Sequence, residues 1–330
     1  MNTFGRLFRI SIYGESHNNS VGALIDGVPA GIKLSEEDFK ADLLRRKASG
    51  LATTPRIEPD EIIIESGLFN GYTTGAPILV RFLNTNTRSK DYSNLVDMPR
   101  PGHADLVLKE KFGGFNDYHG GGASSGRLTL GVVAAGVIAK KILNGVKFNT
   151  EITNLGGETN KELFDYVLKN AIDKNDSVGG IVKINIQNAP KSLGEPYFDS
   201  LESTISHLLF SVGGVKGVEF GDGFDAVTLR GSMFNDLIVD EYGHTKTNHS
   251  GGINGGISNG NDIDVRVFIK PTSSISIPQD TFNFKNNKIE ELVIEGRHDA
   301  AIILRAQVVC EAMCAIALAD AYLINKALNK

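Results

Sequence analysis

The chain has 330 residues, of which 41% are hydrophobic, so it is long enough to bury a large core and is typical of an ordinary globular protein. Its formal net charge of −5 and pI near 5.8 argue against nucleic acid as a partner, so we expect clustered basic residues to bind a small anionic ligand. The N-terminal residues lack a signal-peptide core, and no window approaches 18 consecutive apolar residues. We therefore expect a cytoplasmic protein without a membrane partner.

The first hundred residues predict strands and one helix. The alternating pattern of residues 7–13 predicts a strand that delivers His17 in a turn, where it serves either as an acid or as a surface histidine. Residues 35–47 predict a helix with an acidic first turn, whose final cations either complement the dipole or hold an anionic substrate. Residues 61–65 and 76–83 are expected to pair as antiparallel strands.

The stretch from Arg100 to Gly131 combines two histidines, a run of glycines and a helix start. Residues 120–122 are glycines that can adopt positive φ, and Ser124 or Ser125 can cap a helix expected over about 127–143. Unpaired N–H groups, the positive end of the dipole and Arg127 would together suit a phosphate. The structural alternative is a flexible loop that precedes a helix.

The second half of the chain predicts a scaffold of helices and strands. Helices are expected at 160–174, 201–210 and 304–328, and strands at 180–186, 215–220 and 263–269. Cys310 and Cys314 are expected to be buried thiols. No repeat or low-complexity linker occurs, so a single domain spanning residues 1–330 is the simplest organisation.

Neither common nucleotide motif is expected to operate here. The Walker pattern is absent, and the glycine pattern of residues 221–226 is the nearest match to a dinucleotide fingerprint. We expect residues 226–229 to continue as a strand, which would remove the helix dipole on which that motif depends.

Two further segments place polar groups at the ends of elements. The strand at 263–269 follows a glycine-rich stretch and leads into a Lys-Pro-Thr-Ser-Ser segment at 270–274, which either binds a polar ligand or simply forms a turn at an edge strand. Residues 297–299 are Arg-His-Asp, directly before the last helix. Asp299 is therefore either a helix-start carboxylate or part of a site.

Five segments, in order, resemble chorismate synthase, and the resemblance covers nearly the whole chain. They are GESH at 14–17, RPGHAD at 100–105, GGIS at 255–258, KPTSS at 270–274 and GRHD at 296–299. The resemblance implies an α+β fold, a single-domain β-α-β sandwich assembled as a homotetramer. It implies an enzyme that converts 5-enolpyruvylshikimate 3-phosphate to chorismate and phosphate by an anti 1,4-elimination, with reduced FMN and no metal. Both self-reduction of the flavin with NADPH and an outside supply of reduced flavin are compatible with the sequence.

The matched positions imply roles for individual residues. His17 would protonate the leaving phosphate, His103 would donate to the N1/O2 edge of the flavin, and Asp299 would help draw a proton from N5. The substrate would be held by guanidinium groups, which bind phosphate and carboxylate oxygens in a bidentate manner, from Arg46, Arg127 and Arg297. The implied flavin positions are Ala123, Ser124, Ser125, Gly213, Gly214, Gly255, Lys270, Pro271, Thr272, Ser273, Ser274 and Arg297.

Several pocket positions depart from the family pattern. GESHG ends here in Asn18, Ala52 stands in place of an arginine, and Gly213 in place of an asparagine. RGGGRSSARE reads HGGGASSGRL at 119–128, which removes two arginines and a glutamate. One charge-assisted hydrogen bond to a phosphate contributes about 1.5–3 kcal/mol, so we expect weaker substrate binding unless Arg56 or a partner subunit compensates. The alternative is a family member that binds flavin or a related anion without efficient turnover.

Overall fold

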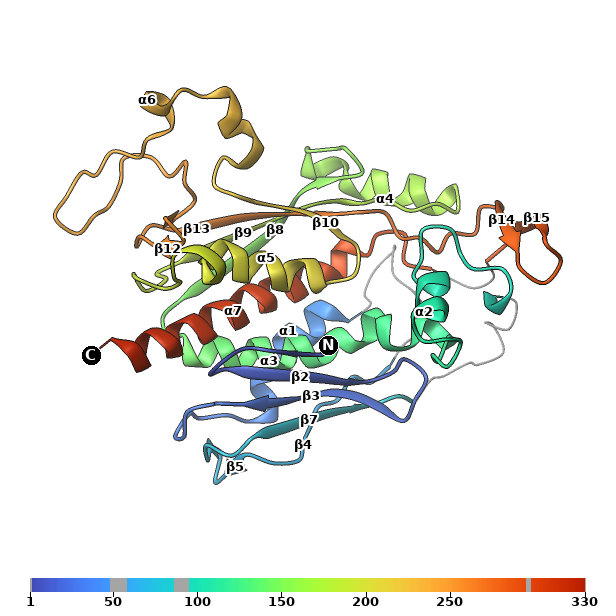
Figure 1. Ribbon diagram of the computed structural model, residues 1–330, viewed down its shortest axis with the longest axis horizontal. Helices are drawn as coiled ribbons and strands as arrows, with labels where there is room; N and C mark the ends of the chain where they lie inside the picture. The colour runs from blue at the N-terminus through green and yellow to red at the C-terminus, as the bar shows by residue number, and fades with distance from the viewer. Residues whose placement is uncertain (1, 48–57, 86–94, 295–297, 330) are drawn as a thin grey trace.

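Two antiparallel sheets enclose a layer of helices in the computed structural model, which describes residues 2–47, 58–85, 95–294 and 298–329 (Figure 1). The strand order is β1-β2-β3-β7-β4 in one sheet and β10-β13-β9-β8 in the other. Helices α3 and α7 run between the two sheets, where α3 packs on β3 and α7 packs on β8 and β9 (Figure 1). The expected α+β fold, a β-α-β sandwich, is confirmed.

The first sheet comes from the N-terminal quarter of the chain. Its strands are β1 Thr3–Phe4, β2 Arg9–Gly14, β3 Ser20–Asp26, β4 Ile63–Ile64 and β7 Ile78–Leu83. Alternate residues of β7, namely Ile78, Val80 and Phe82, are fully buried, as the two-residue period of a strand requires. The expected antiparallel pairing is confirmed by β4 and β7, and the small hairpin of β5 Leu68–Phe69 and β6 Tyr72–Thr73 lies between them in the chain.

The second sheet comes from the middle of the chain. Its strands are β8 Lys147–Leu155, β9 Gly180–Gln187, β10 Val215–Phe220 and β13 Ile263–Ile269. The predicted strands at 180–186, 215–220 and 263–269 are confirmed. The edge strand β8 was not predicted, because it carries mostly polar residues and only Leu155 is buried.

The helices divide into two buried core helices and shorter surface helices. Their bounds are α1 Lys40–Arg46, α2 Asp105–Lys111, α3 Thr129–Ile142, α4 Phe164–Asp173, α5 Leu201–Ser211, α6 Gly231–Phe234 and α7 Ile303–Leu328. An added Cβ at Gly136 would lie 2.4 Å from the Cβ of Ala312, so glycine allows α3 and α7 to approach closely. Residues 119–142 and 303–328 are apolar enough to cross a membrane, but 72% and 78% of their most apolar windows are buried within the protein.

The loop after β10 differs from its prediction. Residues 226–229 do not continue as a strand, since Gly223–Thr228 form a 3-10 helix. Gly221 has a φ of +56°, and an added Cβ would lie 2.1 Å from the carbonyl oxygen of His249. The glycine therefore serves a tight backbone crossing, and the short 3-10 helix supplies no α-helix dipole for a dinucleotide.

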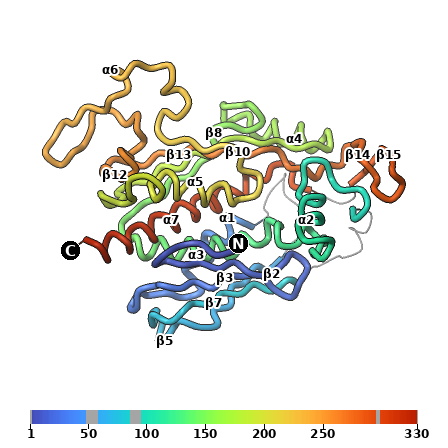
Figure 2. Tube along the Cα trace, in the orientation of Figure 1, coloured from blue at the N-terminus to red at the C-terminus, as the bar shows by residue number. Residues whose placement is uncertain are grey.

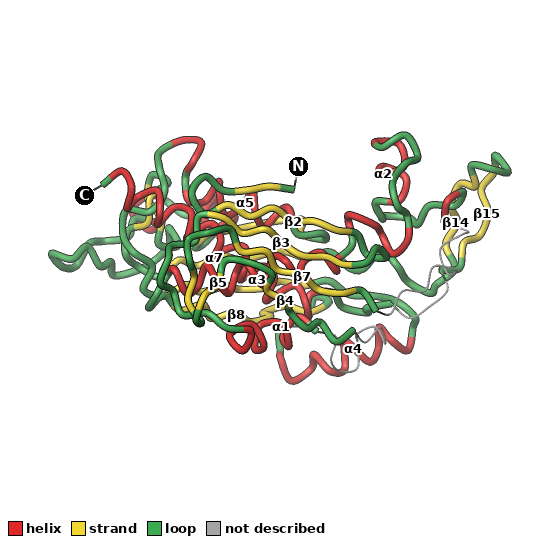
Figure 3. The backbone as a smooth tube through the Cα atoms, turned by 90° about the horizontal axis from the view of Figure 1, so that it is seen from below, coloured by secondary structure: helices red, strands yellow, loops and turns green. Residues whose placement is uncertain are grey.

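Three segments project from the sandwich. The chain between β10 and the hairpin of β11 Ile253–Asn254 and β12 Ile257–Ser258 extends outward and carries α6 (Figure 2). Helix α2 and the hairpin of β14 Gln279–Asn283 and β15 Lys288–Leu292 project at the end of the molecule away from the C-terminus (Figure 3).

Candidate active site

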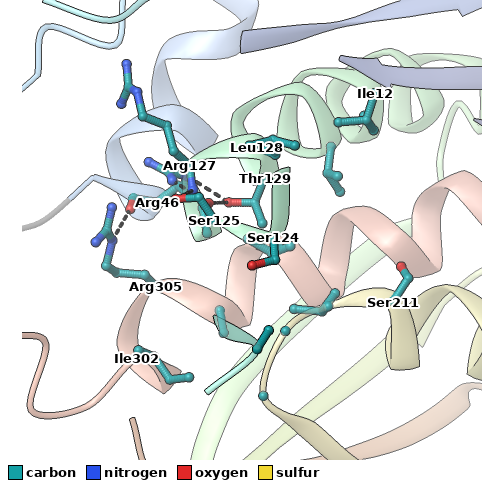
Figure 4. Close-up of a pocket in the computed structure, with 18 of the residues that line it drawn as sticks. Ile12, Arg46, Ser124, Ser125, Arg127, Leu128, Thr129, Ser211, Ile302 and Arg305 are labelled. Carbon is teal, nitrogen blue, oxygen red and sulfur yellow. Dashed lines mark hydrogen bonds between the residues drawn. The ribbon is translucent and has the colours of Figure 1, made fainter. Parts of the chain in front are cut away.

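A cavity of about 780 Å³ opens beside the first turns of α3 and α7. Its walls come from β2, the ends of α1 and α5, and the segments 123–129 and 270–274. Most of the predicted site residues line it: Arg46, His103, Ala123, Ser124, Ser125, Arg127, Gly213, Gly214, Lys270, Pro271, Thr272, Ser273, Ser274 and Asp299. Figure 4 shows Arg46, Arg127 and Arg305 on one side, with Ile12 and Ser211 on the other.

Two of the predicted arginines share a carboxylate. Arg127 Nη1 donates to Asp60 Oδ1 at 2.8 Å, and Arg46 Nη1 lies 3.6 Å from Asp60 Oδ2. Asp60 is 8% exposed and was not predicted from the sequence. The Arg127 charge is therefore balanced by a fixed carboxylate, a feature that the sequence did not indicate.

Arg46 is held rigidly and is still able to donate. Its Nε bonds Thr129 Oγ1 at 3.0 Å and its Nη2 bonds the Gly126 carbonyl at 2.8 Å, whereas Nη1 makes no hydrogen bond to the described residues. Burial, together with the charges of Arg305 and Arg127, lowers the pKa of Arg46 to about 9. An anion bound here would oppose that shift and take the remaining donor.

Arg305 adds a third guanidinium that the sequence analysis missed. It lies in the first turn of α7, bonds Asp299 Oδ2 at 3.0 Å and reaches the Arg46 carbonyl at 3.1 Å. Asp299 lies four residues before α7, lines the cavity and forms an ion pair with this arginine. The predicted Arg297 lies outside the described residues, as do Ala52 and Arg56.

His103 is oriented from behind by a charged pair. Its Nδ1 lies 2.7 Å from Asp105 Oδ1 and 3.1 Å from Arg100 Nη2. Lys270 Nζ donates to the carbonyl of Gly102 at 3.1 Å and also bonds Ser273. Burial and the charge of Lys216 lower the pKa of Lys270.

The glycine run packs against both predicted catalytic histidines. Gly120, Gly121 and Gly122 have φ values of +57°, +84° and +51°. An added Cβ at Gly120 would lie 2.4 Å from His17 Cε1, and one at Gly121 would lie 3.9 Å from His103 Nε2. The backbone at these positions therefore runs between the two imidazoles, which is a close approach that a flexible loop does not require.

Other predicted positions lie apart from the cavity wall. Within the described chain, neither His17 nor Gly255 lines the cavity; Gly255 lies in the turn between β11 and β12. His119 pairs with Asp117, and its ring centroid lies 6.0 Å from that of His17.

His207 of α5 lines the cavity, and it was not predicted as a site residue. Its ring stacks on Phe4 with centroids 5.7 Å apart. The sequence offered no signal for this placement, because β1 and α5 meet through the fold and lie far apart in the chain.

The cysteines and acidic groups give no metal site in the described parts of the chain. Three His, Cys, Asp or Glu residues do not come together there in an arrangement that could hold an ion. Cys310 and Cys314 are fully buried, and burial raises the pKa of Cys310 to about 12. The prediction of buried thiols is confirmed.

A cavity lined by the buried guanidinium groups of Arg46 and Arg127 is a site for a small anionic molecule. Residues 8–323 match the family model for chorismate synthase. The chain is 53% identical to a chorismate synthase of Chitinophaga pinensis over 100% of this chain and 99% of the relative, and 42% identical to one of Methanocaldococcus jannaschii over 97% and 96%. A crystal structure of chorismate synthase matches with a TM-score of 0.75 and 27% identity, covering 99% of this chain and 94% of that one. The chain belongs to the chorismate synthase family and is a carbon–oxygen lyase that acts on phosphates.

Proposed function

We propose that the cavity binds 5-enolpyruvylshikimate 3-phosphate beside reduced FMN, and that the chain expels phosphate by an anti 1,4-elimination to give chorismate. The observation that carries this proposal is the grouping of Arg46, Arg127 and Arg305 around two carboxylates, those of Asp60 and Asp299. A substrate with one phosphate and two carboxylates needs several fixed cations, and guanidinium binds such groups in a bidentate manner. Arg297, from the adjoining segment, would add a fourth.

The residues of the cavity fit a flavin. Its volume of about 780 Å³ lies within the range of roughly 300–1,000 Å³ that is usual for ligand pockets. Ile10, Ile12 and Val212 provide an apolar wall, and Thr272 Oγ1 is a buried hydroxyl without a hydrogen bond to the described residues. When bound, reduced FMN would supply the electron density that the elimination needs.

The side chains would divide the proton chemistry among them. His103 would donate a hydrogen bond to the N1/O2 edge of the flavin, and Asp299, held by Arg305, would accept a proton from the N5 side. His17 would protonate the departing phosphate, reaching it past the Gly120 backbone against which it packs.

The setting of the reaction is also part of the proposal. The expected assembly is a homotetramer in the cytoplasm. The flavin would be reduced either by the chain itself with NADPH or by an outside source.

Replacement of the arginines tests the proposal. In an anaerobic assay with photoreduced FMN, Arg46→Lys and Arg305→Lys should raise the KM for the enolpyruvyl substrate by roughly ten- to a hundredfold, since each loses bidentate contacts. Arg230→Lys, on the exposed segment near α6, is the matched control and should leave KM unchanged. An unchanged KM in both cavity variants would contradict the proposed substrate position.

A further inference from the structure

A chain of buried polar contacts runs behind His103. Arg100 donates to Asp105 through Nε at 2.8 Å and through Nη2 at 2.8 Å, so the pair is bidentate. Its remaining Nη1 donates to Ser274 Oγ at 2.9 Å. The Arg100 and Asp105 side chains are 7% and 10% exposed, which protects these contacts from water.

The chemistry of the three groups assigns the proton on His103. A guanidinium donates and never accepts, whereas an ionised carboxylate accepts and never donates. Burial alone would raise the pKa of Asp105, but hydrogen bonds from Arg100 and His103 outweigh it and hold the pKa well below its usual range. The 2.7 Å contact is therefore satisfied when His103 Nδ1 carries the hydrogen, because it then donates to Asp105 Oδ1. Arg100 Nη2, 3.1 Å from Nδ1, then donates to Asp105 Oδ1 at 2.8 Å and makes no hydrogen bond to the imidazole.

We infer that Asp105 is a positioning residue for the reaction. It holds His103 with Nδ1–H directed at the carboxylate, which leaves Nε2 for the cavity that His103 lines. A second hydrogen on Nε2 would give the imidazolium, the form that donates to Asp105 and to the flavin at the same time, and the Asp105 carboxylate would balance its charge. Arg100 fixes Asp105 and ties it to Ser274. This inference rests on the proposed contact between His103 and the flavin, and it assigns the groups that prepare the imidazole for that contact.

The same contacts connect His103 to the segment 270–274. Ser274 binds Arg100, while Lys270 and Ser273 both donate to the carbonyl of Gly102, the residue before His103. A ligand that orders this segment would therefore also fix the imidazole. Among the described residues, Asp105 and Arg100 contact the imidazole, Lys270 bonds the carbonyl of Gly102 beside it, and the charge of Arg100 also acts on His298.

A structural role for Asp105 makes a different prediction. Asp105 is in the first turn of α2, where a carboxylate also favours the helix dipole. If it served the helix alone, its replacement would change the stability of α2 without changing the state of His103. Glu110→Gln, an exposed carboxylate on the same helix, is the matched control.

Nitrogen-15 NMR of the imidazoles in the flavin-free protein tests the inference, with His103→Gln used to assign the signal. In the wild type and in Glu110→Gln, the neutral His103 ring should carry its hydrogen on Nδ1, and in Asp105→Asn a substantial fraction should carry it on Nε2. With reduced FMN and substrate, kcat of Asp105→Asn should fall at least tenfold while the substrate KM changes less than threefold. Ser274→Ala should lower kcat in the same direction and weaken FMN binding in a fluorescence titration.

The outcomes separate the inference from the proposed function. An unchanged tautomer together with unchanged kcat in Asp105→Asn overturns the inference, and so does a loss of stability alone. Should Asp105→Asn fail to fold, an unchanged His103 signal and unchanged kcat in Ser274→Ala overturn it. Full activity in His103→Gln contradicts the proposed role of His103, whereas the tautomer measurement still tests the contact with Asp105.

Discussion

Substitution of Gly120 by alanine perturbs His17 without changing any ionisable group. The added Cβ would lie 2.4 Å from His17 Cε1, 2.7 Å from Nδ1 and 2.7 Å from Ser16 Oγ. Since 3.4 Å is an ordinary contact, the imidazole must move by about 1 Å, and a displacement of that size can cost about a hundredfold in rate. The positive φ adds about 1–2 kcal/mol of backbone strain.

Gly113→Ala separates these two effects. Gly113 has a φ of +60°, close to the +57° of Gly120, and its added Cβ meets nothing nearer than 3.8 Å. Both variants should lose unfolding free energy in urea through the shared positive φ, and Gly120→Ala should lose more because of its contacts with His17 and Ser16, whereas kcat in the anaerobic assay should fall about a hundredfold in Gly120→Ala alone. Equal kcat in the two variants would refute the placement of His17 against the glycine run.

Three further predictions follow from buried contacts. Asp60→Asn leaves two guanidinium groups without their carboxylate, so the free energy of unfolding in urea should fall by about 3 kcal/mol. Added phosphate should restore more stability to this variant than to the wild type, and equal gains would contradict the pairing. Because the pKa of Asp105 is lowered, its carboxylate stabilises the fold fully above about pH 4. Below that pH, the difference in unfolding free energy between the wild type and Asp105→Asn should shrink by up to about 1.4 kcal/mol per pH unit. A difference that stays constant in acid would contradict this prediction. Gly136→Ala should destabilise the protein by about 1–3 kcal/mol through the contact with Ala312. The control Gly231→Ala should not, because Gly231 is a helical glycine whose added Cβ meets nothing within 4 Å. A larger loss of stability in Gly231→Ala than in Gly136→Ala would contradict the close packing of α3 on α7.

Local patterns were sufficient to predict much of the scaffold. The alternating residues of β13 and the long apolar run of α7 appear where periodicity placed them. The polar edge strand β8 and the short helix α2 escaped prediction, because neither carries a strong apolar pattern. The strand expected at 226–229 is a 3-10 helix, since Gly223 at positive φ turns the chain.

The candidate site was predictable where segments matched the family and unpredictable where distant groups pair. Arg46, His103 and Asp299 were named from the sequence, and all three line the cavity. Asp60 and Arg305 were not predicted because each acts through a contact with a distant residue. Asp60 binds Arg127, 67 residues away along the chain, and Arg305 binds the carbonyl of Arg46, 259 residues away. Such pairings depend on how the sheets and α7 pack, and no local pattern indicates them.

The central claim is that the protein eliminates phosphate from 5-enolpyruvylshikimate 3-phosphate bound in this cavity. The reaction would use reduced FMN and the two histidines beside the glycine run, His17 and His103. The most direct measurement is an anaerobic single turnover in which chorismate and phosphate are quantified together. It compares the wild type with His17→Ala, His103→Ala and a control, His244→Ala. The His244 ring lies on the projecting segment and contacts Asp240. We predict equal amounts of the two products from the wild type and the control, and rates reduced at least a hundredfold in the other two variants. Folded wild-type protein that binds flavin and releases neither product would contradict the account.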